Sequence, residues 1–204
     1  MTQQANGATL QAITARWGLN PAHSELQAAL PLLHGGRALD LGCGVGRNAL
    51  WLQQHGFAVT AWDNDPRKLD RLRQMIAAEA LSEITVEAHD LNRLRFNGAW
   101  DLVICTVVMM FLQPESIPQL IADMQASTVK GGYNLIVAAM DTEDAPCLQP
   151  FPFTFRSGEL SHYYRRWQIM KYNEDLGQLH RVDADGNRIT QRFATLLARK
   201  APPE

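Results

Sequence analysis

The sequence predicts an α/β fold in which a mostly parallel, seven-stranded sheet ends in an antiparallel hairpin. Three observations support this prediction. Short apolar segments alternate with helical patterns, which is typical of βαβ units. Residues 133–140 are strongly apolar apart from Asn134, as a central parallel strand buried on both faces should be. The last two apolar segments flank a turn at residues 185–187, Asp-Gly-Asn, which is typical of a hairpin.

In the first half of the chain, strands are predicted where apolar residues cluster, at residues 37–41, 57–62 and 84–88. Helices are predicted between them, at residues 47–55 and 68–80. Gly56 follows the first helix at the usual stop position, and the second helix carries its charges on one outer face.

In the second half, strands are predicted at residues 101–106, 133–140, 168–174 and 192–199, with a helix at residues 117–127. The turn Gly131-Gly132 precedes the apolar strand. A further helix is predicted after Ser157, with this serine as its N-cap. Residues 141–152 form a proline-rich, acidic loop, and loops of this length are often functional.

Length and composition predict one globular domain over residues 1–204. The hydrophobic content is 46% and the charged content 20%, both typical of such domains. The net charge of −2, without a basic cluster, excludes nucleic acid as an expected partner. The longest apolar segment, residues 102–112, is shorter than the about 20 residues that span a membrane. No secretory signal is expected either, so the sequence predicts a cytoplasmic protein without a membrane partner.

The three cysteines, Cys43, Cys105 and Cys147, include no CxxC pair. This sparse set indicates reduced thiols rather than disulfides, and no metal site is predicted. Cys43 and Cys105 fall in a glycine loop and a central strand, where small buried thiols are common.

The strongest local signal is the segment 40–48, Asp-Leu-Gly-Cys-Gly-Val-Gly-Arg-Asn, where an apolar strand ends and a helix begins. Glycines there let the backbone turn sharply and approach a ligand closely. The pattern is GxGxG after an acidic residue, not the GxGxxG of dinucleotide-binding proteins. It therefore favours a ligand without a pyrophosphate, such as S-adenosylmethionine, whose carboxylate suits a helix N-terminus.

Three further strand ends carry polar groups that suit this ligand. Asp63 lies 63 − 40 = 23 positions beyond Asp40, near the offset of about 20 at which an acid meets ribose hydroxyls. Asp90 and the backbone N–H of Leu91 are placed to bind the adenine of S-adenosylmethionine. Thr106 is placed to contact the methionine part of the same ligand. Because open α/β sheets bind ligands at the carboxyl ends of their strands, we expect these groups to share one site.

The sequence resembles the tellurite resistance methyltransferase TehB family. The resemblance is carried early in the chain by residues 39–48, 61–63, 106–112 and 130–142. It continues in the more specific segments 151–153, 158–160, 171–175, 179–181, 185–188 and 192–195, and covers about residues 13–200. It implies a Rossmann-like class I methyltransferase that takes S-adenosylmethionine as cofactor and tellurite as acceptor, with selenium oxyanions as further acceptors.

The resemblance also implies site residues. His180, Arg181 and Arg188 are expected at the active site, where cationic donors would hold a small inorganic oxyanion. His180 could act there as a cation or as a base. The predicted contacts to the cofactor are Arg16, His23, Asp40, Gly42, Arg47, Asp63, Asn64, Asp90, Leu91 and Thr106.

The N-terminal segment, residues 1–25, is expected to cover the cofactor, and residues 201–204 to be a frayed tail. The family often has a basic residue before the His-Ser pair at positions 23–24, whereas this chain has Ala22. A cofactor role therefore depends on Arg16 and His23. The alternative is that Trp17 and Leu19 only pack the segment onto the core.

Two other functions remain open at this point. The chain could methylate another small acceptor, such as an organic thiol or a thiopurine, or bind S-adenosylmethionine without catalysis. The second is disfavoured because a binding protein would not need His180, Arg181 and Arg188 together. A homodimer is also open, since the sequence does not define the oligomeric state.

Overall fold

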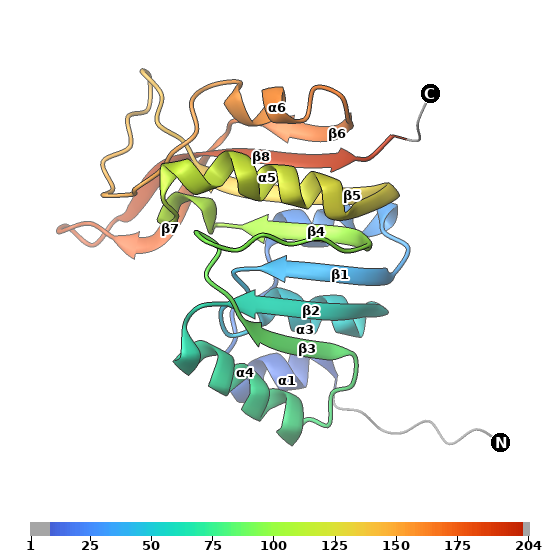
Figure 1. The fold of residues 1–204 in the computed structure, drawn as a ribbon. Helices are drawn as coiled ribbons and strands as arrows, with labels where there is room; N and C mark the ends of the chain where they lie inside the picture. The colour runs from blue at the N-terminus through green and yellow to red at the C-terminus, as the bar shows by residue number, and fades with distance from the viewer. Residues whose placement is uncertain (1–8, 202–204) are drawn as a thin grey trace. The chain divides into compact units, whose positions relative to one another are not determined.

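The computed structural model describes residues 9–201 (Figure 1). These residues form two compact units that divide between Asp90 and Leu91. Parts of the predicted N-terminal segment and tail, residues 1–8 and 202–204, lie outside the described residues. The prediction of one domain over residues 1–204 stays a prediction. No helix within residues 9–201 is long and apolar enough to cross a membrane.

The first unit contains three parallel strands, in which β2 pairs with both β1 and β3 (Figure 1). The strands are β1 (Gly36–Leu41), β2 (Phe57–Asp63) and β3 (Ile84–Ala88). The helices are α1 (Leu10–Trp17), α2 (Ser24–Ala29), η1 (Leu30–Leu32), α3 (Arg47–Gln54) and α4 (Pro66–Ala78). The predicted strands and the two longer helices are present, with ends shifted by no more than two residues.

Local chemistry explains where α4 begins. The side chain of Asp65 accepts hydrogen bonds from the backbone N–H groups of Arg67 and Lys68, and Pro66 occupies the first helical position. Both features are typical of a helix N-terminus. The N-cap of α4 is therefore fixed two residues after Asp63, the last residue of β2.

The second unit combines parallel and antiparallel strands. β4 (Trp100–Thr106) pairs with β5 (Thr128–Ala139) in parallel. β8 (Arg188–Arg199) is antiparallel to β5 and to β6 (Gln168–Asn173), which confirms the antiparallel end of the predicted sheet. The helical segments are η2 (Met109–Phe111), η3 (Pro114–Ser116), α5 (Ile117–Ser127) and α6 (Glu159–Tyr163).

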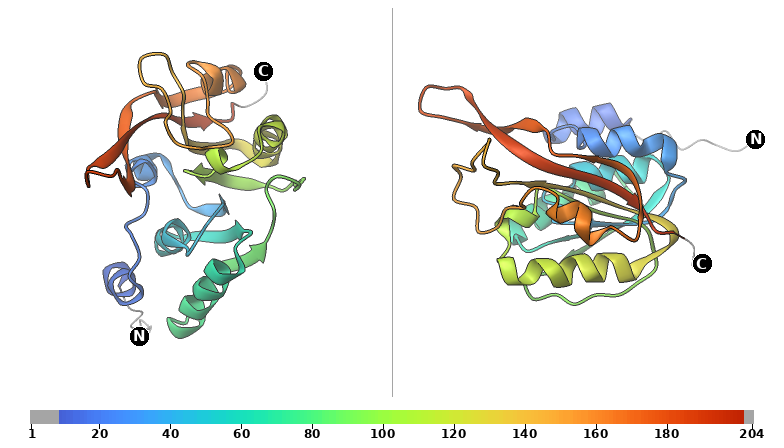
Figure 2. Two further views of the ribbon diagram at one scale, coloured as in Figure 1. Left: turned by 90° about the vertical axis from the view of Figure 1, so that its left-hand side faces the viewer. Right: turned by 90° about the horizontal axis from the view of Figure 1, so that it is seen from above.

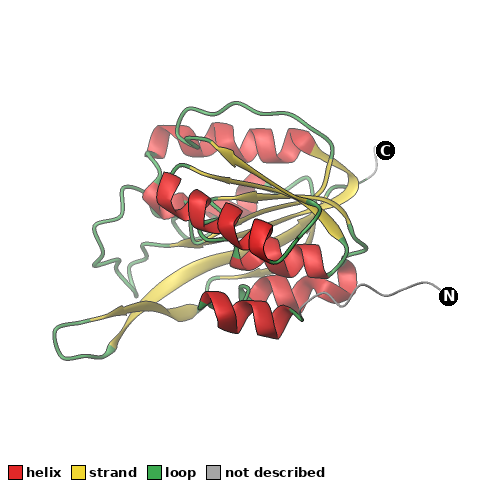
Figure 3. Ribbon diagram, turned by 90° about the horizontal axis from the view of Figure 1, so that it is seen from below, coloured by secondary structure: helices red, strands yellow, loops and turns green. Residues whose placement is uncertain are grey.

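A strand at Leu176–Val182, β7, replaces part of the polar loop that the sequence predicts. It pairs with β8 and forms a two-stranded ribbon that extends beyond the other strands of the second unit (Figures 2 and 3). Most of its residues are exposed, so β7 lacks the apolar face by which strands are recognised. The described residues therefore contain eight strands, one more than predicted.

The predicted N-cap of α6 is wrong. The helix begins at Glu159 after Gly158, whose φ is 73°, and no side chain caps it. The hydroxyl of Ser157 donates instead to Oε2 of Glu174 at 2.6 Å. The hydroxyl of Ser157, which the local sequence pattern assigns to the helix N-terminus, thus binds Glu174, a residue distant in the sequence.

Candidate functional site

The loop between β1 and α3 has the backbone that the glycine pattern predicts. Gly42, Gly44 and Gly46 have φ of 73°, 57° and 91°. A Cβ on Gly46 would lie 2.4 Å from Cδ1 of Leu72 in α4, so a side chain there would collide with that helix. A Cβ on Gly44 would meet nothing within 4 Å in the described part of the chain. The loop is therefore closely packed at its end and open at its middle.

Asp63 ties this loop to the start of α4. Its side chain is largely buried, with Asp63 8% exposed at the end of β2. Oδ2 accepts a hydrogen bond from the N–H of Gly44 at 2.8 Å, and Oδ1 accepts one from the N–H of Asp65 at 2.9 Å. Because each carboxylate oxygen has two lone pairs, Asp63 keeps acceptor capacity for the hydroxyls of a ligand.

Asp40 is the most perturbed carboxyl of the first unit. It is 1% exposed, and Oδ2 has no hydrogen-bond partner within residues 9–201. Burial raises the pKa of Asp40 to about 7, while Arg47 opposes the rise and Asp63 adds to it. A buried carboxyl oxygen without a hydrogen-bond partner is costly, so such an atom is usually explained by a ligand or a functional role.

Arg47 and His23 connect the N-terminal segment to the glycine loop. Arg47 donates from Nη1 to the carbonyl of Pro21 at 3.3 Å, and the N–H of His23 donates to Oδ1 of Asn48 at 2.9 Å. Nδ1 of His23 accepts from the N–H of Glu25 at 3.2 Å and so caps α2. The structure therefore brings His23 to the first turn of α3.

Arg16 is engaged elsewhere in the first unit. Its Nη1 donates to both carboxylate oxygens of Glu79, at 2.6 and 2.7 Å, and Trp17 Nε1 donates to the same group at 2.8 Å. The hydrogen bond from Trp17 is the largest effect that holds the pKa of Glu79 below its ordinary value, followed by the hydrogen bond from Arg16. The contacts attach α1 to the end of α4, which is the packing role that the sequence left open. A cofactor role of Arg16 stays a prediction.

The other predicted cofactor residues lie at the ends of strands or within a few residues after them. Asn64 is exposed directly after β2, and Asp90 is exposed two residues after β3. Leu91 is buried, with 6% of its surface exposed. Thr106 ends β4 and is 7% exposed. Their cofactor roles stay predictions.

The residue after Thr106 has an unusual backbone. Val107 has a φ of 59°, and its N–H donates to the carbonyl of Val137 at 2.6 Å. A β-branched residue in this left-handed region is strained, and such strain often lies at functional sites. Nothing in the sequence signals this feature, because valine is common at strand ends.

The predicted active-site residues of the tail lie on the ribbon of β7 and β8. Gln178 of β7 pairs with Thr190 of β8, and Val182 of β7 pairs with Arg188 of β8. The two paired residues are 182 − 178 = 4 positions apart on β7 but only 190 − 188 = 2 positions apart on β8. His180 and Arg181 therefore lie in a β-bulge, a feature that redirects side chains and occurs often beside active sites.

The bulge brings two of the three predicted residues together. Nη2 of Arg188 lies 3.3 Å from Nδ1 of His180, and its Nε donates to the carbonyl of Leu179 at 3.1 Å. Arg181 makes no hydrogen bond to either side chain within the described residues. The exposed His180–Arg188 pair thus offers one cationic group and one imidazole side by side.

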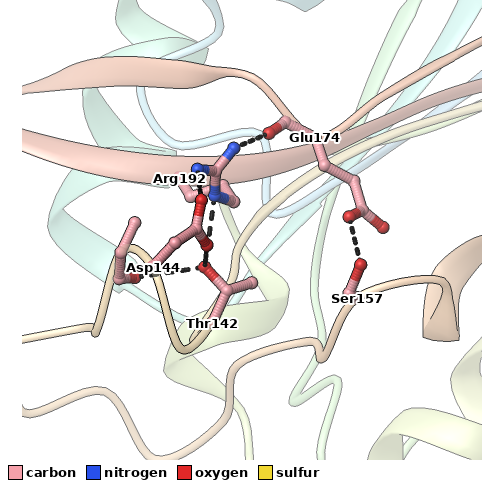
Figure 4. A network of polar contacts seen from close by, with 6 residues as sticks. Thr142, Asp144, Ser157, Glu174 and Arg192 are labelled. Atoms are coloured by element: carbon pink, nitrogen blue, oxygen red, sulfur yellow. Dashed lines mark hydrogen bonds and ion pairs between the residues drawn. The ribbon is translucent and has the colours of Figure 1, made fainter.

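Two residues that sequence reasoning missed, Arg192 and Glu174, bond to the loop 141–158 (Figure 4). Arginine and glutamate side chains usually face solvent, so the sequence carries no signal for this role. Within residues 9–201, no group of three or more histidine, cysteine, aspartate or glutamate side chains could hold a metal ion.

The fold is that of S-adenosylmethionine-dependent methyltransferases of class I, as predicted. A structure of such an enzyme from Methanosarcina mazei matches 90% of this chain and all of its own with a TM-score of 0.67 at 16% identity, which shows the fold alone. The crystal structure of TehB from Haemophilus influenzae matches 93% of this chain and 66% of its own with a TM-score of 0.89 at 41% identity.

The model of the tellurite resistance protein TehB family matches residues 10–197, and the chain belongs to this family. A probable S-adenosyl-L-methionine-dependent methyltransferase TehB from H. influenzae (strain 10810) is 43% identical over 185 residues, which are 91% of this chain and 64% of that protein. A protein of Eikenella corrodens named hemagglutinin 1 is 44% identical over 90% of this chain and 61% of its own. The chain thus spans less than two thirds of the length of these relatives.

Proposed function

We propose that this chain transfers a methyl group from S-adenosylmethionine to tellurite, with selenium oxyanions as further acceptors, and so contributes to tellurite resistance. The observation that carries the proposal is the His180–Arg188 pair at the bulge of the β7–β8 ribbon, in a member of the TehB family. An arginine beside an imidazole is a suitable pair of donors for an oxyanion.

The first unit supplies groups that fit the methyl donor. The unpartnered Oδ2 of Asp40 would be compensated by a cationic group such as the ammonium of S-adenosylmethionine. Asp63 would accept hydrogen bonds from the ribose hydroxyls while it holds the N–H of Gly44 in place. The open side of Gly44 leaves room for a ligand against the backbone. The donor, when bound, supplies a sulfonium methyl group that a nucleophile can displace.

The residues of the ribbon would hold the acceptor. Arg188 would donate its guanidinium N–H groups to the oxyanion, and Arg181 would add a second positive charge. Nδ1 of His180 faces a donor nitrogen of Arg188, an arrangement that suits a neutral imidazole with its proton on Nε2. Nε2 would then donate to an oxygen of the acceptor.

The chemistry proposed for this arrangement needs little from a base. The lone pair of tellurium forms the new bond to the methyl carbon as the bond from that carbon to sulfur breaks, and its electrons stay on the sulfur, which leaves as a neutral thioether. The task of the protein is to hold the acceptor in line with the methyl group. Such positioning can lower a barrier by about 7–11 kcal/mol.

The test is methyl transfer by the pure full chain, with tellurite, selenite and a panel of thiols as acceptors. Transfer is measured as labelled methyl groups passed from S-adenosylmethionine to the acceptor and as the demethylated donor formed. His180→Ala and Arg188→Ala should each lower transfer to tellurite roughly a hundredfold, as removal of one oxyanion donor does elsewhere. Their affinity for S-adenosylmethionine, measured by calorimetry, should stay near that of the wild type.

Arg165→Ala is the matched control, because Arg165 is also an exposed arginine whose Nη1 lies beside a histidine, 3.4 Å from Nε2 of His162. It should transfer methyl groups at the wild-type rate. Transfer to thiols but not to either oxyanion would favour the alternative acceptor class. Donor binding without transfer to any acceptor would favour a binding protein.

A further inference from the structure

The loop 141–158 joins β5 to α6 and is held near its beginning by one arginine of β8 (Figure 4). Arg192 donates from Nη2 to Oδ2 of Asp144 at 2.7 Å and from Nε to Oγ1 of Thr142 at 3.2 Å. Its Nη1 donates to the backbone carbonyl of Glu174. All three nitrogens of the guanidinium are therefore used, two of them on the loop.

The end of the same loop is held by Glu174, which follows β6. Oε2 of Glu174 accepts from the hydroxyl of Ser157, and Oε1 accepts from the N–H of Gly158, both at 2.6 Å. Burial alone would raise the pKa of Glu174. The bonds from Gly158 and Ser157, a further bond from Tyr172 and the charge of Arg192 outweigh burial and hold this pKa below its ordinary value. Arg192 and Glu174 thus form one connected anchor for both ends of the loop.

The middle of the loop is attached to β8 as well. Sγ of Cys147 lies 3.2 Å from Oε1 of Gln191, and the N–H of Cys147 donates to Oδ1 of Asp141 at 2.8 Å. Gln191 is 4% exposed, and its Nε2 donates to the carbonyl of Met140 at 2.7 Å. A long loop without secondary structure of its own is ordinarily mobile, so these attachments give it one defined conformation.

The side chain of Arg192 is much less exposed than that of its acidic partner Asp144. Its side chain is 18% exposed, whereas that of Asp144 is 73% exposed, so the charge of Arg192 is the less hydrated of the two. A lysine could not bond in three directions in one plane, because its ammonium is a point donor on a flexible stem. The geometry is therefore specific to arginine.

The position of the loop connects it to the proposed reaction. β4 and β5 are parallel, so the loop begins at the edge of the second unit where Thr106 also ends its strand. Open α/β sheets bind ligands at this edge. Arg192 lies four positions after Arg188 on β8, and residues at this spacing share one face of a regular strand. The same strand thus carries the proposed oxyanion donor and the anchor of the loop.

We propose that Arg192 is a positioning residue, which holds the loop 141–158 in the conformation that forms one wall of the acceptor site. This inference rests on the proposed function. Arg192 itself does not touch the acceptor; it acts through Thr142, Asp144 and Glu174. The loop is then a specificity element, whose defined conformation limits the acceptor to a small ion.

The test compares Arg192→Met, which keeps the length of the side chain without its donors, with Arg192→Lys and with Asp144→Asn. Asp144→Asn changes an exposed side chain, so it should fold and keep the proposal testable even if Arg192→Met does not fold. Arg199→Met is the matched control, because Arg199 also lies on β8 and donates from Nε to one carbonyl, that of Gly131.

Two readouts separate positioning from a general loss of structure. Amide hydrogen exchange of the protein alone should accelerate at Ala145, Cys147 and Gly158 by about tenfold or more in Arg192→Met, since a bond to a charged group is lost. In steady-state assays, the KM for tellurite should rise by a similar factor, while the Kd for S-adenosylmethionine changes less than twofold. Arg192→Lys should recover part of both effects, and Asp144→Asn should show a smaller change in the same direction.

The outcomes distinguish this inference from the proposed function. If the wild type transfers methyl groups to tellurite but Arg192→Met keeps its KM within twofold, the positioning role is wrong and the proposed function stands. Unchanged exchange of the loop in Arg192→Met would likewise overturn the inference. If the wild type acts on neither oxyanion, the proposed function fails and the positioning role for this acceptor fails with it.

Discussion

Replacing Asp40 with asparagine should remove a pH dependence of stability that the wild-type chain carries when no ligand is bound. The pKa of Asp40 is about 7 in the folded chain, against an ordinary value of 3.8, chiefly because the carboxyl is buried. Between these two values the folded state keeps a proton that the unfolded state has already lost. The free energy of unfolding therefore falls as the pH rises through this range.

The magnitude follows from the two pKa values. The stabilisation is fully present below pH 3.8 and is lost by the time the pH has passed about 7. The whole difference corresponds to about 4 kcal/mol, of which about 2–3 kcal/mol falls between about pH 5 and pH 8. Asparagine in a buried position has its own cost for unpaired N–H groups, but that cost does not change with pH.

Urea unfolding of the ligand-free wild type and of Asp40→Asn at several values between about pH 5 and pH 8 tests this expectation. The stability of the variant relative to the wild type should increase by about 2–3 kcal/mol across the range. Asp70→Asn, in which an exposed carboxyl on α4 is replaced, serves as the control and should show no such trend. A difference between Asp40→Asn and wild type that stays constant with pH would refute the reasoning about Asp40.

Four other changes test separate parts of the molecule. Asp63→Ala should weaken binding of S-adenosylmethionine in calorimetry by about tenfold or more, because a charged acceptor is lost and the glycine loop is released. Val107→Gly should relieve backbone strain and raise the free energy of urea unfolding by about 1 kcal/mol, while methyl transfer falls. Trp17 and Arg16 favour the ionised form of Glu79, so the wild type loses this stabilisation as the pH falls below 4.5 and the carboxylate is protonated. Glu79→Gln should therefore lose less stability than the wild type over the same pH range. Arg188→Lys should retain only part of the transfer rate, since an ammonium cannot replace the guanidinium fork.

The parts of the fold that the sequence predicts well are those with a buried apolar pattern. Residues 102–105 of β4 are all nearly inaccessible, and this segment is recognisable as a strand from its composition alone. The glycine loop is equally clear, because Gly46 is required both by its backbone angle and by the contact with Leu72. Asp63 is predicted as a ribose ligand from its spacing, but not as the anchor of Gly44, because spacing says nothing about the contacts of a loop.

The parts that the sequence does not predict depend on pairing between distant segments. β7 has no apolar face, and its strand conformation comes from the backbone bonds to β8. The local pattern around Ser157 predicts a helix cap, yet Glu174 takes the hydroxyl because it lies beside the loop in the folded chain. The positive φ of Val107 likewise has no local cause that its own side chain reveals.

The proposed acceptor site shows why these failures all lie in the second unit. Its donors depend on the register of a hairpin, since the bulge on β7 brings His180 to Arg188. Its proposed wall depends on Arg192, which acts only because residues far apart in the sequence converge on one guanidinium. The donor residues proposed in the first unit, by contrast, lie at the ends of its strands, an arrangement that the order of the sequence already contains. In a family of this kind, we therefore expect the donor site to be readable from the sequence and the acceptor specificity to require the structure.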